Sequence, residues 1–374
     1  MKIIAYYLPQ FHEIPENNKW WGKGFTEWEN VKNAQKLFND HNQPRVPKNG
    51  NYYNLDDINV MIKQAKLAQK YGIYGFCYYH YWFNGKKLLE KPLENMLKEP
   101  KVDIPFCLSW ANETWTRTWA DKNKEVLIKQ EYGKKADWEK HFYYLLDYFM
   151  DDRYIKIDGS PLFIIYRPYN IPKLKEMINF WQELAVKTGL SKIKFAYQDR
   201  QYNHLIDENG YLFDFGIEYQ PQIVMHEEQL KLHTRINRTF NVLADKLPFL
   251  RNKFTMMRLN YDTLWKNIIT NEPRDEKMIP GAFVDWDNTP RYKNRGSICV
   301  NVTPEKFHSY LTKQIINARE KYKKEFIFLF AWNEWGEGGY LEPDEKYSFQ
   351  MLEAIERALE ETGELNAKNV HEKD

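Results

Sequence analysis

Short apolar runs alternate with amphipathic segments along most of the chain. An uninterrupted apolar run is typical of a strand that is buried on both faces, as in a parallel sheet covered by helices. The runs predict eight strands, at Ile3–Tyr7, Gly75–Tyr79, Pro105–Trp110, Leu162–Tyr166, Lys194–Tyr197, Phe215–Tyr219, Ala282–Trp286 and Phe326–Ala331.

The segments between these runs carry apolar residues three and four positions apart, which is the spacing of one helix face. The clearest examples are the segments 58–68, 307–318 and 352–359. Strands that alternate with helices in about eight units predict an α/β fold, a (β/α)8 TIM barrel, in a single domain over residues 1–362. An open doubly wound sheet is the alternative, but no Gly-rich phosphate-binding turn follows the first strand.

The segment from about residue 226 to residue 274 is too long for a simple connection and predicts a helical insertion between strands 6 and 7. Its residues Ile236, Phe240, Leu243 and Leu247 predict an apolar helical stripe with positive charges beside it. We favour a helical lid packed on the barrel. The alternative is an amphipathic surface for a lipid-linked or phosphorylated substrate. The polar segment 363–374 predicts a flexible tail.

Polar and aromatic residues collect where the predicted strands end, whereas the helix-to-strand turns are plain connectors. In a barrel all C-terminal strand ends converge on one face, where active sites are built. This asymmetry predicts an enzyme. The candidate substrate-binding residues are Tyr7, Gln10, Glu27, Trp28, His80, Trp82, Trp110, Asn112, Glu113, Tyr166, Arg167, Tyr219, Asp285, Trp286, Trp332, Asn333 and Trp335. A hydrogen-bonded core role is the alternative for His80, and loop capping is the alternative for Glu27 and for Asp285 with its neighbour Asp287.

Two carboxylates, Glu334 and Glu337, follow the last strand among tryptophans and glycines. A pair of carboxyl groups divides the acid and base roles in glycosidic-bond cleavage, and burial raises the pKa that a general acid needs. In a helical turn the two Cβ atoms would lie about 5–6 Å apart, and in extended chain up to roughly 10 Å. The spacing therefore leaves retention and inversion both open.

Glu113 is the other candidate acid. The dipeptide Asn-Glu occurs at Asn112-Glu113 and again at Asn333-Glu334, each time after a predicted strand. A pairing of Glu113 with Glu334 across the barrel mouth is therefore the alternative to the pair within the last loop.

Composition narrows the class of ligand. Aromatic residues make up 16% of the chain, with 13 tryptophans and 26 tyrosines, which favours a carbohydrate because flat rings stack on the apolar faces of sugars. A core rich in aromatics is the plain alternative. The 54 basic residues against 52 acidic ones give a net charge of +2, which argues against a general nucleic-acid binder.

The three cysteines form no disulfide framework, and no cluster of histidines, cysteines and acids has metal-ligand spacing, so we expect neither metal nor cofactor. No apolar stretch approaches the length of a membrane span. No signal-peptide pattern precedes the first strand. If Met1 is the native start, we expect a cytoplasmic protein, with peripheral attachment to the inner membrane as a variant of that expectation.

Three motifs carry a family resemblance: Tyr6–His12, Trp20–Trp28 and Trp332–Gly338. They closely resemble the WbsX-type proteins of bacterial surface-polysaccharide gene clusters. The last strand and its loop also resemble glycoside hydrolase family 99, the endo-α-mannosidases, which implies a (β/α)8 barrel. In that family the matching loop carries two glutamates that act with retention through a 1,2-anhydro sugar. The resemblance implies that Glu334 is the base for the sugar's 2-hydroxyl and that Glu337 is the acid/base.

The sequence thus predicts a retaining, endo-type glycoside hydrolase that acts on an oligosaccharide or polysaccharide with α-linked, mannose-like sugars. One alternative is a glycosyltransferase or transglycosylase in the biosynthesis of O-antigen, capsule or another surface polysaccharide, with a lipid-linked glycan as substrate. The other is a non-catalytic glycan-binding barrel.

Overall fold

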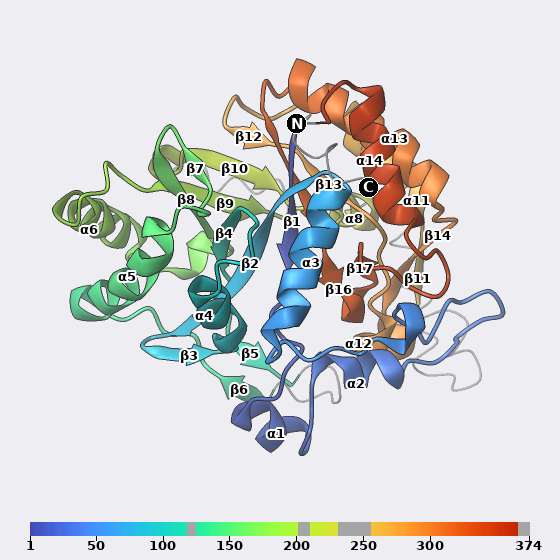
Figure 1. Ribbon diagram of the computed structural model, residues 1–374, viewed down its shortest axis with the longest axis horizontal. Coiled ribbons are helices and arrows are strands. Elements are labelled where there is room, and N and C mark those ends of the chain that lie inside the picture. The colour runs from blue at the N-terminus through green and yellow to red at the C-terminus, as the bar shows by residue number, and fades with distance from the viewer. Residues whose placement is uncertain (118–124, 201–209, 231–255, 366–374) are drawn as a thin grey trace.

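The computed structural model describes residues 1–117, 125–200, 210–230 and 256–365 (Figure 1). Its main sheet is a parallel barrel, as predicted, and every barrel strand except β12 overlaps a predicted apolar run. The barrel strands are β1 (Lys2–Tyr7), β2 (Ile73–Phe83), β4 (Phe106–Trp110), β8 (Ser160–Ile165), β9 (Lys194–Asp199), β10 (Phe215–Glu218), β12 (Met278–Ile279), β13 (Gly281–Phe283) and β15 (Phe326–Phe330).

The barrel closes through its seventh strand, which is split into β12 and β13 at Pro280 because proline has no N–H to donate to a sheet. β12 pairs with β10, with Gly216 opposite Met278, and β13 pairs with β15, with Gly281 opposite Phe328. A Cβ atom on Gly281 would lie 1.8 Å from a backbone oxygen of β10. Glycine is therefore required where these strands meet.

Helices surround the sheet (Figure 1). The three predicted amphipathic segments are confirmed as helices, at α3, α13 and α14, with their apolar residues turned to the core. The longer helices are α3 (Ile58–Lys70), α4 (Lys91–Lys98), α5 (Lys135–Met150), α6 (Leu174–Lys187), α8 (Gln222–Leu230), α11 (Tyr261–Thr270), α13 (Pro304–Glu320) and α14 (Gln350–Glu361).

Aromatic side chains fill part of the barrel interior. The ring of Tyr6 lies 5.7 Å from Tyr79, 5.2 Å from Tyr219 and 5.7 Å from Phe328, which belong to different barrel strands or follow one directly. Part of the aromatic content therefore lies in the core, which was the alternative to a role in carbohydrate binding.

Short elements gather at the C-terminal ends of the barrel strands, at the bottom of the view in Figure 1. The turn containing Glu334 and Glu337 follows β15, and Arg291 lies on a single-turn helix that follows the seventh strand. The short elements are α1 (Pro15–Trp21), α2 (Glu27–Lys32), the hairpins β2–β3 (Lys86–Leu88) and β5 (Trp115–Thr116)–β6 (Val126–Ile128), α12 (Thr289–Tyr292), β16 (Asn333–Glu334), the 3-10 turn η5 (Trp335–Glu337) and β17 (Gly339–Tyr340).

The predicted insertion is described only in part. Its apolar stripe at 236–247 lies outside the described residues. The described remainder contains α11 and a strand, β11 (Met257–Asn260), which pairs in parallel with β14 (Ser297–Val300). The insertion is therefore not wholly helical. Residues 366–374 of the predicted tail also lie outside the described residues. Among the helices that are described, none combines the length and the apolar character needed to cross a membrane.

Candidate active site

Glu334 and Glu337 lie on the tight turn that follows β15. Gly338 adopts a left-handed backbone conformation, with φ of 68°, which favours glycine. A Cβ atom on Gly336 would lie 2.2 Å from Glu27 Oε1. The glycines among these acids therefore let a third carboxylate from α2 approach the turn.

A guanidinium, that of Arg291 on α12, joins the three carboxylates. Its Nε donates to Glu27 Oε1, its Nη1 to Glu337 Oε1 and its Nη2 to Glu334 Oε1, each at 2.7 Å. The side chains of Arg291, Glu27 and Glu334 are 10%, 2% and 6% exposed, while Glu337 is 21% exposed. The fork geometry of arginine thus arranges the two predicted catalytic acids and Glu27 around one centre.

No sequence pattern indicated Arg291. It stands two residues after the start of a one-turn helix, where an arginine is ordinarily a solvated surface residue. Its position after the seventh strand was the available signal, because that places it on the same barrel face as the acids.

Burial dominates the electrostatics of this cluster. It raises the pKa of Glu334 to about 8; Arg291 opposes this shift, while the charges of Glu337 and Glu27 add to it. Burial alone would lower the pKa of Arg291, but the three carboxylates outweigh it and raise that pKa well above its usual value. Glu334 is therefore a carboxyl whose proton is exchanged close to neutral pH.

A second buried network holds the turn in place. Asp287 accepts a hydrogen bond from Gln43 Nε2 at 2.7 Å and lies 2.9 Å from His41 Nε2. Its backbone N–H donates to the carbonyl oxygen of Glu337 at 2.7 Å. Burial alone would raise the pKa of Asp287, but the hydrogen bond with His41 and the charge of Arg45 lower it to about 2. This carboxylate positions the backbone that carries Glu337.

Arg45 extends that network to Asp285. The guanidinium lies 2.9 Å from Asp285 Oδ2 and donates to the carbonyl oxygen of Gly338 at 3.1 Å. Asp285 was predicted to contact substrate, with loop capping as the alternative. The structure places it in this loop-holding network, outside the cavity described next.

A cavity of about 400 Å³ opens in front of the acid cluster. Of the predicted site residues, it is lined by Gln10, Glu27, Glu113, Tyr166, Tyr219, Glu334 and Glu337. The lining also includes Leu8, Asn17, Trp21, Phe25, Tyr79, Tyr81, Ala111, Thr114, Trp115, Thr116, Leu127 and Arg291, which were not among the predicted site residues.

The other predicted residues are not among those that line the cavity, and strand geometry explains several of them. Side chains alternate along β2, so Tyr79 and Tyr81 reach the cavity while His80 and Trp82 face α5. His80 Nε2 lies 2.8 Å from His141 Nε2, and burial lowers the pKa of His80 to about 3. This places His80 in the core, the role that was its alternative. Tyr7 likewise points outward, and its hydroxyl donates to Gln64 on α3.

The two asparagines of the Asn-Glu pairs also serve the scaffold. Asn333 accepts from the N–H of Leu8 at 2.7 Å and donates to the carbonyl oxygen of Leu8 at 3.0 Å. Asn112 makes the same pair of bonds with the backbone of Arg167, at 2.7 and 2.8 Å. Each amide thus ties its strand end to a neighbouring strand end, which leaves the following glutamate directed into the cavity.

The predicted tryptophans other than Trp82 are also buried in the scaffold and do not line the cavity. They are Trp28, Trp110, Trp286, Trp332 and Trp335. Trp335 stacks on Tyr340 at 3.7 Å and donates to Glu342 at 2.7 Å. These rings support the loops that carry the acids.

Glu113, the other candidate acid, lines the same cavity as Glu334. Arg167 donates to Glu113 at 2.6 Å, and the Glu113 side chain is 39% exposed. Arg167 itself is not among the cavity-lining residues. Within the part of the chain that is described, no three histidine, cysteine or acidic residues are grouped as metal ligands.

Comparison with known proteins places this barrel in a family. The family model described as glycosyltransferase WbsX matches residues 3–355. The chain belongs to this WbsX family. It is 34% identical over 362 residues to the uncharacterized protein WxcX from two strains of Xanthomonas campestris pv. campestris. The match covers 96% of this chain and 49% of each relative, so the chain spans about half the length of these curated relatives.

Solved structures of similar fold support the barrel assignment. The GH99 endo-alpha-mannosidase from Bacteroides thetaiotaomicron superposes with a TM-score of 0.56 at 14% identity, over 97% of this chain and 98% of that one. A glycoside hydrolase-like protein superposes with a TM-score of 0.58 at 13% identity, over 96% of this chain and 93% of that one. At these identities the likeness shows the fold of the WbsX-family chain.

Proposed function

We propose that this WbsX-family chain is an endo-acting glycoside hydrolase that cleaves an α-linked, mannose-like glycan with retention. The observation that carries the proposal is the meeting of Glu334 and Glu337 at the guanidinium of Arg291, in a cavity at the C-terminal mouth of the barrel. Barrel enzymes build their active sites at this face. Most glycoside hydrolases break the glycosidic bond with a pair of carboxyl groups.

The division of roles follows the resemblance to the endo-α-mannosidases, and the electrostatics are compatible with it. Glu334 is the base: its raised pKa makes it a stronger base than an ordinary carboxylate, and Arg291 favours its ionised form. Glu337 is the more exposed of the two and is the acid that meets the departing sugar oxygen.

In the first half of the proposed reaction, Glu334 takes the proton of the 2-hydroxyl, and that oxygen bonds to C1 to form a 1,2-anhydro sugar. The bond from C1 to the leaving oxygen breaks, and Glu337 gives that oxygen its proton. In the second half, water bonds to C1 and gives a proton to Glu337. The bond between C1 and the 2-oxygen breaks, and Glu334 returns the proton. Two inversions at C1 give net retention.

Several cavity residues supply the surfaces that a sugar needs. The rings of Tyr79, Tyr81, Tyr166 and Trp115 line the cavity, and aromatic faces pack against the apolar C–H face of a sugar. Gln10, whose amide donates to the Tyr81 hydroxyl at 2.8 Å, adds a polar group at the same wall. The cavity therefore combines aromatic walls with acids at one end.

The deciding experiment is a screen of α-linked oligosaccharides, with the anomeric form of the first product followed by NMR. We expect cleavage with retained configuration by the unaltered protein and none by the Glu334→Gln/Glu337→Gln double variant. Glycans that are bound and recovered intact would leave a non-catalytic glycan-binding barrel instead. Inverted product would overturn the anhydro-sugar route.

A glycosyltransferase or transglycosylase is the second candidate, because the matching family carries a glycosyltransferase description. The same two acids would then pass the glycosyl group to a sugar hydroxyl instead of water, and a lipid-linked glycan would be the donor. Nucleotide release from a sugar-nucleotide, or chain elongation when an acceptor sugar is added, would favour this candidate. Hydrolysis unaffected by acceptor would favour the first.

A further inference from the structure

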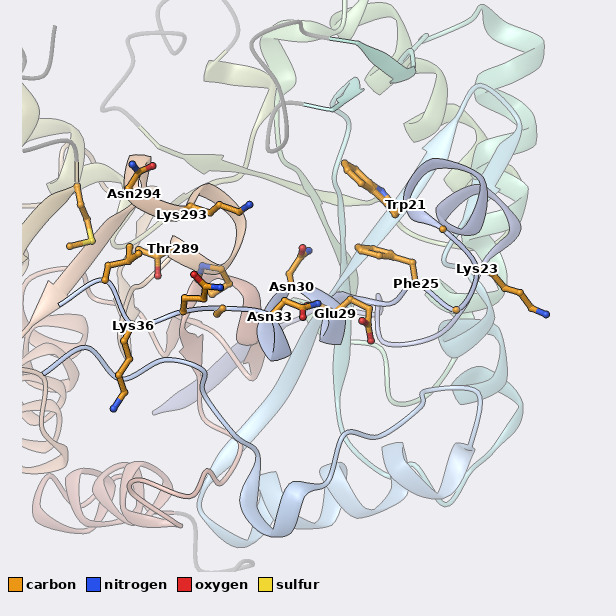
Figure 2. Close-up of a pocket in the computed structure, with 17 residues that line it drawn as sticks. Trp21, Lys23, Phe25, Glu29, Asn30, Asn33, Lys36, Thr289, Lys293 and Asn294 are labelled. Carbon is orange, nitrogen blue, oxygen red and sulfur yellow. The ribbon is translucent and has the colours of Figure 1, made fainter. Parts of the chain in front are cut away.

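A second and larger hollow adjoins the acid cavity (Figure 2). Its volume is about 1130 Å³. One wall comes from the segments 21–25 and 29–37, and the other includes residues at and after α12. We call this hollow the outer groove. It has no part in the mechanism proposed above.

The outer groove and the acid cavity share walls. Trp21 and Phe25 line both of them. The helix α2 contributes Glu27 to the acid cavity and Asn30 to the groove, and α12 contributes Arg291 to the cavity while Lys293 directly after it lines the groove. A chain that leaves the acid cavity past these two rings would therefore enter the groove.

The lining chemistry fits sugars. Its polar members include Asn30, Asn33, Gln35, Thr289, Lys293 and Asn294. Amide side chains both donate and accept hydrogen bonds, as a row of sugar hydroxyls requires. In Figure 2, Asn30 points into the hollow, with Lys293 and Asn294 on the far side, whereas Lys23 points away.

The rings at the shared wall form a platform. Trp21 and Phe25 stack with centroids 5.7 Å apart and an interplanar angle of 29°. Gly22 and Gly24 between them have φ of 105° and 84°, and this backbone, which favours glycine, turns the chain so that the rings meet. Two parts of the motif Trp20–Trp28 thus have a structural role. Glu27 belongs to the acid cluster, and Trp21 with Phe25 forms this platform.

Size indicates how much glycan the groove holds. Small-molecule sites have volumes of roughly 300–1,000 Å³, so the acid cavity at about 400 Å³ is at the low end and the groove exceeds the range. We propose that the outer groove binds the sugar units that flank the bond cleaved at the acids, so that the substrate is an extended glycan chain. This inference rests on the proposed function and specifies the length of its substrate.

The test compares two substrate lengths. In the double variant Asn33→Ala/Lys293→Ala, we expect kcat/KM for an α-linked manno-disaccharide to stay unchanged and that for the hexasaccharide to fall about tenfold, through KM, because two hydrogen bonds are lost. The matched control is Asn179→Ala/Lys187→Ala, at exposed positions of α6, which should change neither value. An equal fall in kcat/KM for the disaccharide and the hexasaccharide, or no fall for either, would overturn the groove assignment.

Binding separates this inference from the proposed function. Calorimetry with the hexasaccharide uses the Glu334→Gln variant with and without the groove substitutions. If the unaltered protein cleaves nothing but the groove substitutions weaken binding about tenfold, the groove assignment stands and hydrolysis fails. If neither length is bound or cleaved, both proposals fail.

Discussion

The dipeptide Asn-Glu occurs at two barrel strand ends. The two asparagines make the same kind of backbone contact, whereas the two glutamates have different surroundings. Asn112 and Asn333 each bracket the backbone of a neighbouring strand end with two hydrogen bonds. Glu113 and Glu334 then both face one cavity, and each meets an arginine. Identical local sequence has produced the same local scaffold.

The difference lies in what surrounds each glutamate. The Glu113 side chain is 39% exposed and pairs with Arg167, whereas Glu334 is 6% exposed and shares Arg291 with two further carboxylates. Burial raises the pKa of a carboxyl, and it does so for Glu334. The motif therefore directs a carboxylate into the cavity, but its tertiary surroundings determine the proton chemistry.

The strongest way to break this comparison is to remove each acid in turn. We expect Glu334→Gln and Glu337→Gln each to lower kcat by about 10²–10⁴-fold, the usual contribution of a positioned acid or base. Glu113→Gln is the control, and its loss should stay within about tenfold because the proposed reaction gives Glu113 no proton to transfer and the amide can still accept from Arg167. Steady-state kinetics on a cleaved α-linked oligosaccharide measures all three. A loss for Glu113→Gln as large as for Glu334→Gln would favour the pair across the barrel mouth.

The arginines should differ in their effect on stability. Arg291→Ala leaves buried carboxylates without their counter-charge and should lower the free energy of unfolding by about 3–5 kcal/mol. Arg167→Ala removes a pair with an exposed member and should cost about 1 kcal/mol or less. Urea denaturation measures both. If Arg291→Ala and Arg167→Ala lowered the free energy of unfolding by similar amounts, burial of Glu334 would not be what makes its ion pair with Arg291 important for stability.

Substitution of the two asparagines tests whether the two strand ends are held in the same way. Asn333→Ala leaves the buried N–H and carbonyl oxygen of Leu8 without partners. Asn112→Ala leaves only the N–H of Arg167 without a partner, because the Arg167 carbonyl oxygen still accepts from the N–H of Asn170 at 3.1 Å. The free energy of unfolding should fall by about 2 kcal/mol for Asn333→Ala and by about 1 kcal/mol for Asn112→Ala. Asn59→Ala, at an exposed position near the start of α3, is the control. A loss at one asparagine and not the other would mean that the two strand ends are not equivalent.

The pH dependence of the base is measured in the Glu337→Gln variant, so that no titrating acid masks it. Because Glu334 must be ionised to act as base, kcat/KM of this variant for a substrate with an activated leaving group should rise with pH towards about 8, by up to about tenfold per unit. Glu113→Gln should leave this profile unchanged. A profile that is flat between pH 6 and pH 8 would contradict the assignment of Glu334 as base.

The same shift has a consequence for stability. A carboxyl with a raised pKa favours the folded state while it is protonated, and this contribution is lost as pH rises through the folded pKa of about 8. Glu334→Gln remains neutral at every pH. Its free energy of unfolding should therefore improve relative to the unaltered protein between pH 5 and pH 9, as measured by urea denaturation.

The fold was largely predictable because uninterrupted apolar runs mark doubly buried strands and three-and-four spacing marks the covering helices. The pairing of β11 with β14 was not predicted, because a parallel pair between short segments 40 residues apart leaves no local pattern. The acids were found because they follow a strand, and Arg291 was not, because one arginine on a short helix resembles a surface residue.

The sequence by itself indicated the apolar runs around which the barrel strands form and the acids that follow them, although β2 continues to Phe83 and β13 ends at Phe283. It did not determine which side chains face the barrel mouth. A strand buried on both faces is apolar at every position, so its hydrophobicity has no alternation from which to tell Tyr79 and Tyr81 from His80 and Trp82. That choice, and the meeting of Glu27, Glu334 and Glu337 at Arg291, depend on how distant strand ends pack together, which the tertiary structure alone decided.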